Sequence, residues 1–293
     1  MKILITGSNG QLASEIRDLI YLYKTTDFVF RDSQDLDICD FNALKKFITK
    51  QNVSGVINCA AYTDVDKAEE NSEIVNQVNS EGVLNLVNAL KAVNGKLIHI
   101  STDYVFDGTN SQPYNELDPV NPLGVYGKSK RDGELAIINS RIDGIVIRTS
   151  WLYSSYGNNF VKKIINLGLE KKELSIVFDQ VGTPTYARDL AKTCLNIICE
   201  NNSTKISEKG KIYNYSNEGV ASWFDIAKEI IKLSTIVCKV TPVLTKEFPT
   251  KAKRPHYSVL DKTNIKKDFS IEIPYWRDSL KDCILKINKS KSQ

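Results

Sequence analysis

Residues 1–13 have the sequence MKILITGSNGQLA, in which an apolar run ends in two glycines three residues apart. The run 2–6 predicts a buried strand, and the helical periodicity of residues 11–23 predicts a helix directly after it. Glycines at such a turn let the backbone approach a pyrophosphate closely, and the helix start offers free N–H groups. The stretch therefore predicts a dinucleotide-binding turn, with a plain tight turn as the alternative. The expected cofactor contacts are Gly7, Asn9, Gly10, Gln11 and Leu12.

The alternation of short apolar runs and helical patterns continues to about residue 150. It predicts strands at 2–6, 27–30, 54–59, 96–101 and 144–149, and helices at 11–23, 41–49, 74–93 and 126–138. Strands separated by helices require crossover connections, which produce a parallel sheet with helices on both faces. We therefore predict an α/β fold with a doubly wound parallel sheet of the Rossmann type. Ligands of such sheets bind at the carboxyl ends of the strands.

After residue 149 the alternation weakens. Helical patterns cover 159–169, 186–199 and 222–233, and short strand-like runs cover 174–178 and 211–215. We expect a dinucleotide-binding domain over residues 1–150. Residues 151–293 are expected to form mainly a smaller C-terminal substrate-binding lobe, with some segments returning to the first domain. The last residues, 286–293, are expected to be a frayed polar tail.

Composition excludes several classes of function. The net charge is +4 and the basic residues are spread along the chain, so we expect no nucleic-acid partner. No stretch approaches the roughly 20 apolar residues of a membrane span. The six cysteines lack CxxC spacing, which argues against zinc and disulfides and favours the cytoplasm. His99 lies inside an apolar run and is expected to be a satisfied core histidine rather than a ligand.

Polar and small residues follow the second and third predicted strands. Arg31 follows the second strand, where a base would accommodate the 2′-phosphate of NADPH, although an exposed loop charge is equally compatible. Asp40 could place a carboxylate near the adenine amino group, or it could cap the next helix. Small residues after the third strand leave room for a cofactor, or are plain packing. The residues that follow the third strand, and are the candidates for cofactor contact there, are Ala60, Ala61, Tyr62 and Thr63.

A catalytic set is predicted by Tyr126 and Lys130, which are four residues apart at a helix start and so share one face. When hydride reaches a ketone carbon, the oxygen becomes negative, and a phenol can protonate it. A nearby ammonium is expected to lower the phenol pKa from about 10. We therefore predict Tyr126 as the proton donor and Lys130 as the cation that assists it and holds the nicotinamide ribose. Thr102, at the end of the fourth strand, is predicted to donate a second hydrogen bond to the carbonyl oxygen.

These motifs resemble the extended short-chain dehydrogenase/reductase family, and most closely its reductases of dTDP-linked 4-keto sugars. The resemblance covers nearly the whole chain. It is carried by GSNGQL (7–12), NCAAYTDVDKAE (58–69), STDYVF (101–106), YGKSK (126–130), RTSWLY (148–153), GNNF (157–160), DQVGTPT (179–185) and RPHYS (254–258). The glycine-rich and Tyr/Lys stretches are shared by the wider superfamily, whereas the later stretches are specific to the reductases.

The resemblance implies NADPH- or NADH-dependent reduction of the 4-keto group of dTDP-4-dehydro-L-rhamnose to dTDP-L-rhamnose, a polysaccharide precursor. It implies that Thr102, Tyr126 and Lys130 are catalytic, and that Thr102, Asp103 and Trp151 contact the substrate. The implied cofactor contacts are Gly10, Gln11, Leu12, Asp40, Phe41, Ala61, Tyr62 and Thr63. The alternatives are another nucleotide-sugar ketoreductase or epimerase, and a non-catalytic NADP-binding regulatory subunit.

A nucleotide-sugar substrate offers negative charge that the second lobe could grip. Arg254 is the candidate for the diphosphate, because a guanidinium can make two parallel bonds to phosphate oxygens. The alternative is that Arg254 closes a salt bridge. Asn159, at a helix start, could add a neutral donor.

A metal and a partner subunit are implied only by the resemblance. Some members of the family form a magnesium-bridged homodimer through acidic side chains on helices. This chain keeps Glu15 but has Arg188 beside Asp189, which argues against the metal. We therefore expect no metal ligand among the site residues and leave a homodimer open.

Overall fold

The centre of the fold is a six-stranded sheet in which every neighbouring pair of strands is parallel. The computed structural model describes residues 1–199 and 210–291. The strand order is β10-β5-β4-β3-β1-β2. The strands are β1 (Lys2–Thr6), β2 (Asp27–Arg31), β3 (Gly55–Asn58), β4 (Lys96–Thr102), β5 (Asp143–Thr149) and β10 (Lys211–Tyr215). This arrangement confirms the predicted α/β fold with a parallel sheet.

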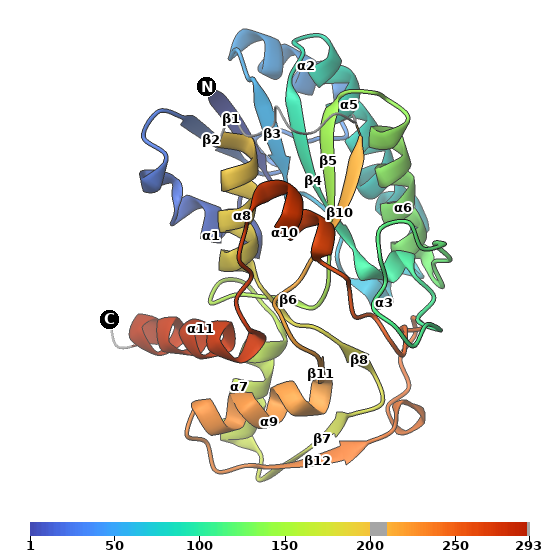
Figure 1. The fold of residues 1–293 in the computed structure, drawn as a ribbon, viewed down its shortest axis with the longest axis vertical. Coiled ribbons are helices and arrows are strands. Elements are labelled where there is room, and N and C mark those ends of the chain that lie inside the picture. The colour runs from blue at the N-terminus through green and yellow to red at the C-terminus, as the bar shows by residue number, and fades with distance from the viewer. Residues whose placement is uncertain (200–209, 292–293) are drawn as a thin grey trace.

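Helices cover both faces of the sheet (Figure 1) because successive side chains of a strand point to opposite faces. Ile3 and Ile5 of β1 pack in a core with α1 (Gln11–Arg17), α8 (Ala187–Cys199) and α10 (Thr263–Phe269). Leu4, between them, faces a second core with α2 (Phe41–Lys50), α5 (Gly82–Lys91) and α6 (Val125–Ile138). The near-continuous apolar strands are thus explained by burial on both faces.

A smaller lobe lies below the sheet in Figure 1 and has its own apolar core. Its main helices are α7 (Phe160–Glu170), α9 (Trp223–Leu233) and α11 (Trp276–Lys291). α7 and α9 pack against a parallel pair, β7 (Glu173–Val177) and β12 (Lys239–Val243), and α11 packs against α9. Two further pairs are β6 (Leu152–Tyr153) with β9 (Thr185–Tyr186), and β8 (Val181–Gly182) with β11 (Ala221–Ser222). Three later elements, α8, β10 and α10, lie with the sheet and not in the smaller lobe. The expected division at residue 150 stays a prediction.

Two predicted helices are divided in the structure. The predicted helix 11–23 ends at Arg17 and is followed by a 3₁₀ turn, Ile20–Leu22. The predicted helix 74–93 consists of α4 (Ser72–Asn76), a π-helical turn (Gln77–Glu81) and α5. Further short elements are α3 (Val65–Ala68) and the 3₁₀ turns Asp103–Val105 and Thr245–Glu247.

The prediction of a frayed tail from residue 286 is wrong as far as Lys291, because α11 continues to that residue. The apolar residues Cys283, Ile284 and Ile287 are buried in the core of the smaller lobe. Lys286 adds ion pairs to Glu15 and Asp18 at 2.7 Å each. Residues 292–293 lie outside the described part of the chain.

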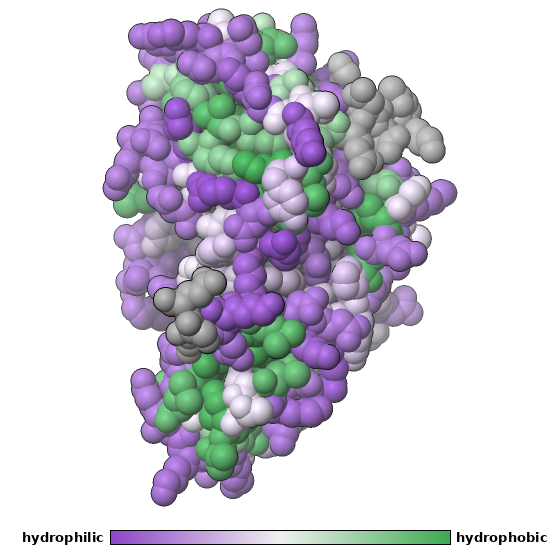
Figure 2. Space-filling view, turned by 90° about the vertical axis from the view of Figure 1, so that its left-hand side faces the viewer, coloured by the Kyte–Doolittle hydropathy of each residue, from purple (hydrophilic) through white to green (hydrophobic). Residues whose placement is uncertain are grey.

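The surface seen from the side of the C-terminus is mostly hydrophilic, with apolar side chains in separate patches (Figure 2). Exposed apolar residues such as Tyr21 and Leu22 are normal on a folded protein. Among residues 1–199 and 210–291, no helix is both long and apolar enough to cross a membrane.

Gly7 tests the turn after β1. Its φ is +61°, and a Cβ there would lie 2.7 Å from the backbone nitrogen of Ala60. We expect Gly7→Ala to lower the free energy of unfolding by about 1–3 kcal/mol, because strain and a backbone clash coincide. Gly10→Ala is the matched control, since its nearest atom would be Gly7 O at 3.1 Å and its φ is ordinary. Urea unfolding measures both, and equal effects of the two substitutions would contradict the strain argument.

Candidate active site

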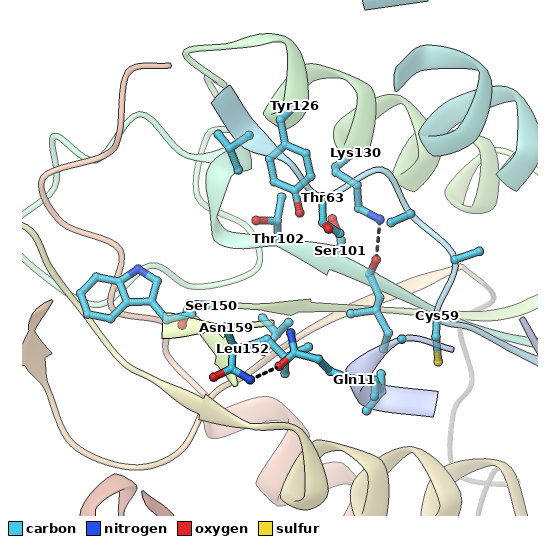
Figure 3. Close-up of a pocket in the computed structure, with 18 of the residues that line it drawn as sticks. Gln11, Cys59, Thr63, Ser101, Thr102, Tyr126, Lys130, Ser150, Leu152 and Asn159 are labelled. Atoms are coloured by element: carbon cyan, nitrogen blue, oxygen red, sulfur yellow. Dashed lines mark hydrogen bonds between the residues drawn. The ribbon is translucent and has the colours of Figure 1, made fainter. Parts of the chain in front are cut away.

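A cavity of about 600 Å³ lies at the carboxyl ends of β1, β3, β4 and β5. Many residues predicted from the sequence line it, and Figure 3 shows several of them. These are Asn9, Gly10, Gln11, Leu12, Ala60, Ala61, Thr63, Thr102, Asp103, Tyr126, Lys130, Trp151 and Asn159. Parallel strands bring these distant segments to one edge. The edge therefore carries both the predicted cofactor set and the predicted catalytic set.

The glycine-rich turn forms one end of the cavity. Gly10 N donates to Gly7 O at 2.9 Å, which closes the turn, and no side chain caps the first turn of α1. Gln11 Oε1 accepts a hydrogen bond from Asn159 Nδ2 at 2.9 Å (Figure 3). Because Asn159 also caps α7, this bond ties the start of α1 to the smaller lobe. The turn leaves backbone N–H groups available for an anionic ligand.

The opposite wall carries Thr102, Tyr126 and Lys130 (Figure 3). Thr102 ends β4, where its hydroxyl donates to Asp103 Oδ1 and accepts from Tyr104 N, both at 3.1 Å. Tyr126 and Lys130 lie one turn apart in α6, so both side chains reach the same wall. The predicted catalytic set is thus assembled, although its chemistry stays a prediction.

Burial shifts the pKa values of the site. It raises the pKa of Tyr126 to about 12, partly offset by a hydrogen bond with Thr102. It lowers the pKa of Lys130 to about 8 and raises that of Asp103 to about 6. The pKa of the phenol therefore moves opposite to the expected direction. The physical reason is that desolvation of the buried phenol dominates and the charge of Asp103 adds to it. Lys130 Nζ donates to Ile100 O at 2.6 Å.

A buried ion pair beneath this wall was missed by the sequence analysis. Glu134 of α6 accepts from Arg148 Nε at 2.8 Å and from Nη2 at 2.7 Å. Ser101 Oγ donates to the same carboxylate at 2.6 Å. The pair links α6, β4 and β5, so it fixes the elements that present Tyr126 and Thr102. Only the arginine in RTSWLY and the helical position of Glu134 could have indicated it.

Other predicted residues lie outside the lining of the cavity: Gly7, Arg31, Asp40, Phe41, Tyr62 and Arg254. Asp40 caps α2 by accepting from Ala43 N at 3.0 Å, which was one of its two interpretations. Arg31 donates to Phe30 O and lies over the Phe47 ring. Contacts of these residues with a cofactor stay predictions.

Arg254 forms the salt bridge that was the alternative to phosphate binding. Its guanidinium makes two hydrogen bonds to Asp66, at 2.7 and 3.2 Å, and one to Ala252 O at 3.2 Å. The pair joins the smaller lobe to α3. A diphosphate could contact this guanidinium only if it shared it with Asp66.

Glu15, the carboxylate that this chain keeps from the magnesium-bridged members, is already paired with cations. Lys286 Nζ lies 2.7 Å from both Glu15 Oε2 and Asp18 Oδ2, and Arg188 Nη1 lies 3.3 Å from Glu15. Ser154 Oγ donates to the remaining oxygen of Glu15 at 2.6 Å. No cluster of three potential metal-ligating side chains occurs among the described residues. This arrangement does not fit a divalent cation at Glu15.

Comparison with known proteins identifies the relatives of the chain. The sequence model of the RmlD substrate binding domain matches residues 1–289. A dTDP-4-dehydrorhamnose reductase of Aggregatibacter actinomycetemcomitans is 37% identical, over 96% of this chain and 97% of the relative. A dTDP-4-dehydrorhamnose reductase from Clostridium acetobutylicum has a crystal structure with a TM-score of 0.92 and 43% identity, covering 98% and 100% of the two chains. A dTDP-4-dehydrorhamnose reductase from Bacillus anthracis, in complex with NADP, has a TM-score of 0.91 and 35% identity, covering 97% and 99%.

Because Glu15 is paired with cations, we predict that the stability of the protein does not depend on divalent metal ions. We expect neither EDTA nor MgCl₂ to shift the Tm, because Lys286 and Arg188 already neutralise the carboxylates. Lys286→Met should lower the free energy of unfolding by on the order of 1–3 kcal/mol, since buried Glu15 loses a charged partner. Lys289→Met, an exposed site on the same helix, is the control. A fall of Tm in EDTA would contradict the account.

Proposed function

The chain belongs to the RmlD substrate binding domain family and is an oxidoreductase, and we propose that it reduces dTDP-4-dehydro-L-rhamnose to dTDP-L-rhamnose. One observation carries the proposal: a single cavity joins the glycine-rich turn to Thr102, Tyr126 and Lys130. The named activity of the relatives supports the choice of substrate. Both parts are needed, since a fold alone does not determine a reaction.

The proposed cofactor is NADPH or NADH, supported by the relative that was crystallised with NADP. When bound, it supplies a hydride to the carbonyl carbon of the substrate. The residues of the cavity fit such a group, because the uncapped start of α1 and the turn at Gly7 leave backbone N–H groups for a pyrophosphate. Ala60, Ala61 and Thr63 follow β3 and line the cavity with small side chains, which leave room for the cofactor. Arg31 is proposed to contact a 2′-phosphate.

Tyr126 is the proposed proton donor. Because burial raises its pKa to about 12, the phenol keeps its proton at neutral pH, which is the form that a donor needs. The proton passes from the Tyr126 hydroxyl to the carbonyl oxygen as negative charge develops there. Thr102 is proposed to donate a second hydrogen bond to that oxygen. Lys130, one turn along α6, is proposed to stabilise the phenolate that remains and to hold the nicotinamide ribose.

Four of the proposed substrate contacts line the cavity: Thr102, Asp103, Trp151 and Asn159. Trp151 adopts a positive φ of 48° and stacks on Trp223, with ring centroids 3.8 Å apart. This stacking supports a rigid indole surface against which a sugar or base can lie. Asp103 is buried beside Thr102, and Asn159 is held by Gln11. A role for Arg254 stays a prediction that depends on sharing its pair with Asp66.

Removal of the Tyr126 hydroxyl tests the reaction. We expect Tyr126→Phe to reduce kcat for NADPH oxidation with dTDP-4-dehydro-L-rhamnose by roughly 10²–10⁴-fold, the scale of general acid catalysis. Binding of NADPH, followed by fluorescence, should change little. Tyr275→Phe, a half-exposed tyrosine of the smaller lobe, is the matched control. Near-normal turnover of Tyr126→Phe would refute the assignment.

Arg31 tests the choice of cofactor. We expect Arg31→Ala to weaken the binding of NADPH more than that of NADH, because only NADPH offers the 2′-phosphate for a charge-assisted bond. Titration of both cofactors measures the two losses. Lys50→Ala, an exposed charge at the far end of α2, should leave both affinities unchanged. Equal losses in Arg31→Ala would show that Arg31 is only a surface charge.

A further inference from the structure

A chain of buried hydrogen bonds leads from β1 to Lys130. Thr6 Oγ1 donates to Asn58 Oδ1 at 2.6 Å, and Asn58 Nδ2 lies 3.0 Å from His99 Nδ1. His99 Nε2 in turn lies 3.3 Å from Lys130 Nζ. All these side chains are at most 1% exposed. These hydrogen bonds therefore cross β1, β3 and β4 among buried side chains and end at a proposed catalytic group.

A backbone N–H group determines which side chains donate and which accept along this series of hydrogen bonds. Ala60 N–H can only donate, and it donates to Asn58 Oδ1 at 3.2 Å. This contact fixes the orientation of the Asn58 amide, so that its NH₂ group is directed at His99 Nδ1. Nδ1 must then accept, which leaves the proton of a neutral imidazole on Nε2. Burial and the charge of Lys130 both lower the pKa of His99, so the ring is neutral.

The Nε2–H group of His99 is thus directed at Lys130 Nζ. An ammonium has three donors and no lone pair, so it cannot accept this hydrogen bond, whereas a neutral amine can. Lys130 meanwhile donates to Ile100 O at 2.6 Å, which either form can do. The geometry therefore favours the amine over the ammonium.

The charges around Lys130 partly oppose the preference for the neutral amine. Glu134 favours the ammonium, but Arg148, Arg131 and Ser101 already bond to its carboxylate. Tyr126 and Cys59 also line the site, and both are neutral because burial raises their pKa values. The remaining titratable groups of the cavity near Tyr126 are Asp103 and Tyr104, and burial raises the pKa of both, that of Asp103 to about 6. Burial outweighs the charge of Glu134 and lowers the pKa of Lys130 to about 8, in the direction that the contact with His99 reinforces.

We propose that His99 is a positioning residue that destabilises the ammonium form of Lys130, so that this lysine gains and loses a proton near neutral pH. The proposal rests on the proposed function, because it assigns the proton state of a group in that reaction. Proton exchange is most effective when the pKa of a group lies near the working pH. His99 acts through Lys130 and does not line the cavity itself.

The tautomer of His99 tests the proposal in the unaltered protein. The chain contains two histidines, so ¹⁵N-histidine labelling gives two sets of ring signals, and His256→Gln assigns them. We expect His99 to remain neutral with its proton on Nε2 between about pH 6 and 9. A proton on Nδ1 would overturn the proposal, because Nε2 would then accept from the ammonium. This measurement uses no substrate, so it is independent of the proposed activity.

The proton state of Lys130 is the second measurement. We expect ¹⁵Nζ-lysine NMR, assigned with Lys130→Met, to show titration at least about one unit below the ordinary value near 10.4. His99→Gln replaces the donor by an amide whose oxygen can accept, so the pKa should rise by about one unit. His256→Gln, the same change at an exposed site, should leave the pKa unchanged. Unshifted titration in a folded His99→Gln protein would overturn the proposal.

Kinetics add a readout that a purely structural role would not change. Reduction needs the ammonium beside Tyr126, so the rate should fall as pH rises through the pKa of Lys130. If His99→Gln raises that pKa, the alkaline limb of kcat/KM for the keto-sugar should move to higher pH by the same amount. A lower rate with an unmoved limb would contradict the proposal. If no variant is active, the two NMR measurements still decide it.

Discussion

The parallel pairing of β1, β3, β4 and β5 is the constraint on which the site depends. Its register places Thr6 beside Asn58, Asn58 beside His99, and Thr102 beside Thr149. Parallel strands end at one edge, and the crossover helices begin there. Segments more than a hundred residues apart in sequence therefore meet in one cavity. The same pairing carries the buried polar chain from Thr6 to Lys130.

Burial of polar groups at this edge is balanced by specific partners. Glu134 is fully buried, yet its carboxylate accepts from Arg148, Arg131 and Ser101, so the charge is compensated. His99 and Lys130 have no such opposite charge between them, and their contact favours neutral forms. The site thus combines a buried carboxylate, Glu134, that is held by its partners with a lysine, Lys130, whose proton is weakly held. That combination suits a reaction in which charge appears and disappears on one oxygen.

The sequence predicted those features that depend on local pattern. The apolar runs located all six strands of the sheet, and the glycine turn and the Tyr126/Lys130 spacing located both ends of the cavity. Features that depend on long-range pairing were missed or left open. Nothing near Lys286 indicates that it meets Glu15, and the fragment around Arg254 does not reveal its pair with Asp66. The pKa of Tyr126 was predicted in the wrong direction, because a sequence does not show how deeply a phenol is buried.

We propose that this oxidoreductase acts on a keto-sugar attached to a nucleotide. The most direct measurement is steady-state oxidation of NADPH by the wild-type protein, with dTDP-4-dehydro-L-rhamnose and with the same sugar lacking its nucleotide, combined with identification of the product. The account predicts turnover of the dTDP-linked sugar to dTDP-L-rhamnose with a much higher kcat/KM than for the free sugar. Absence of that product, or equal kcat/KM for the two compounds, would contradict it.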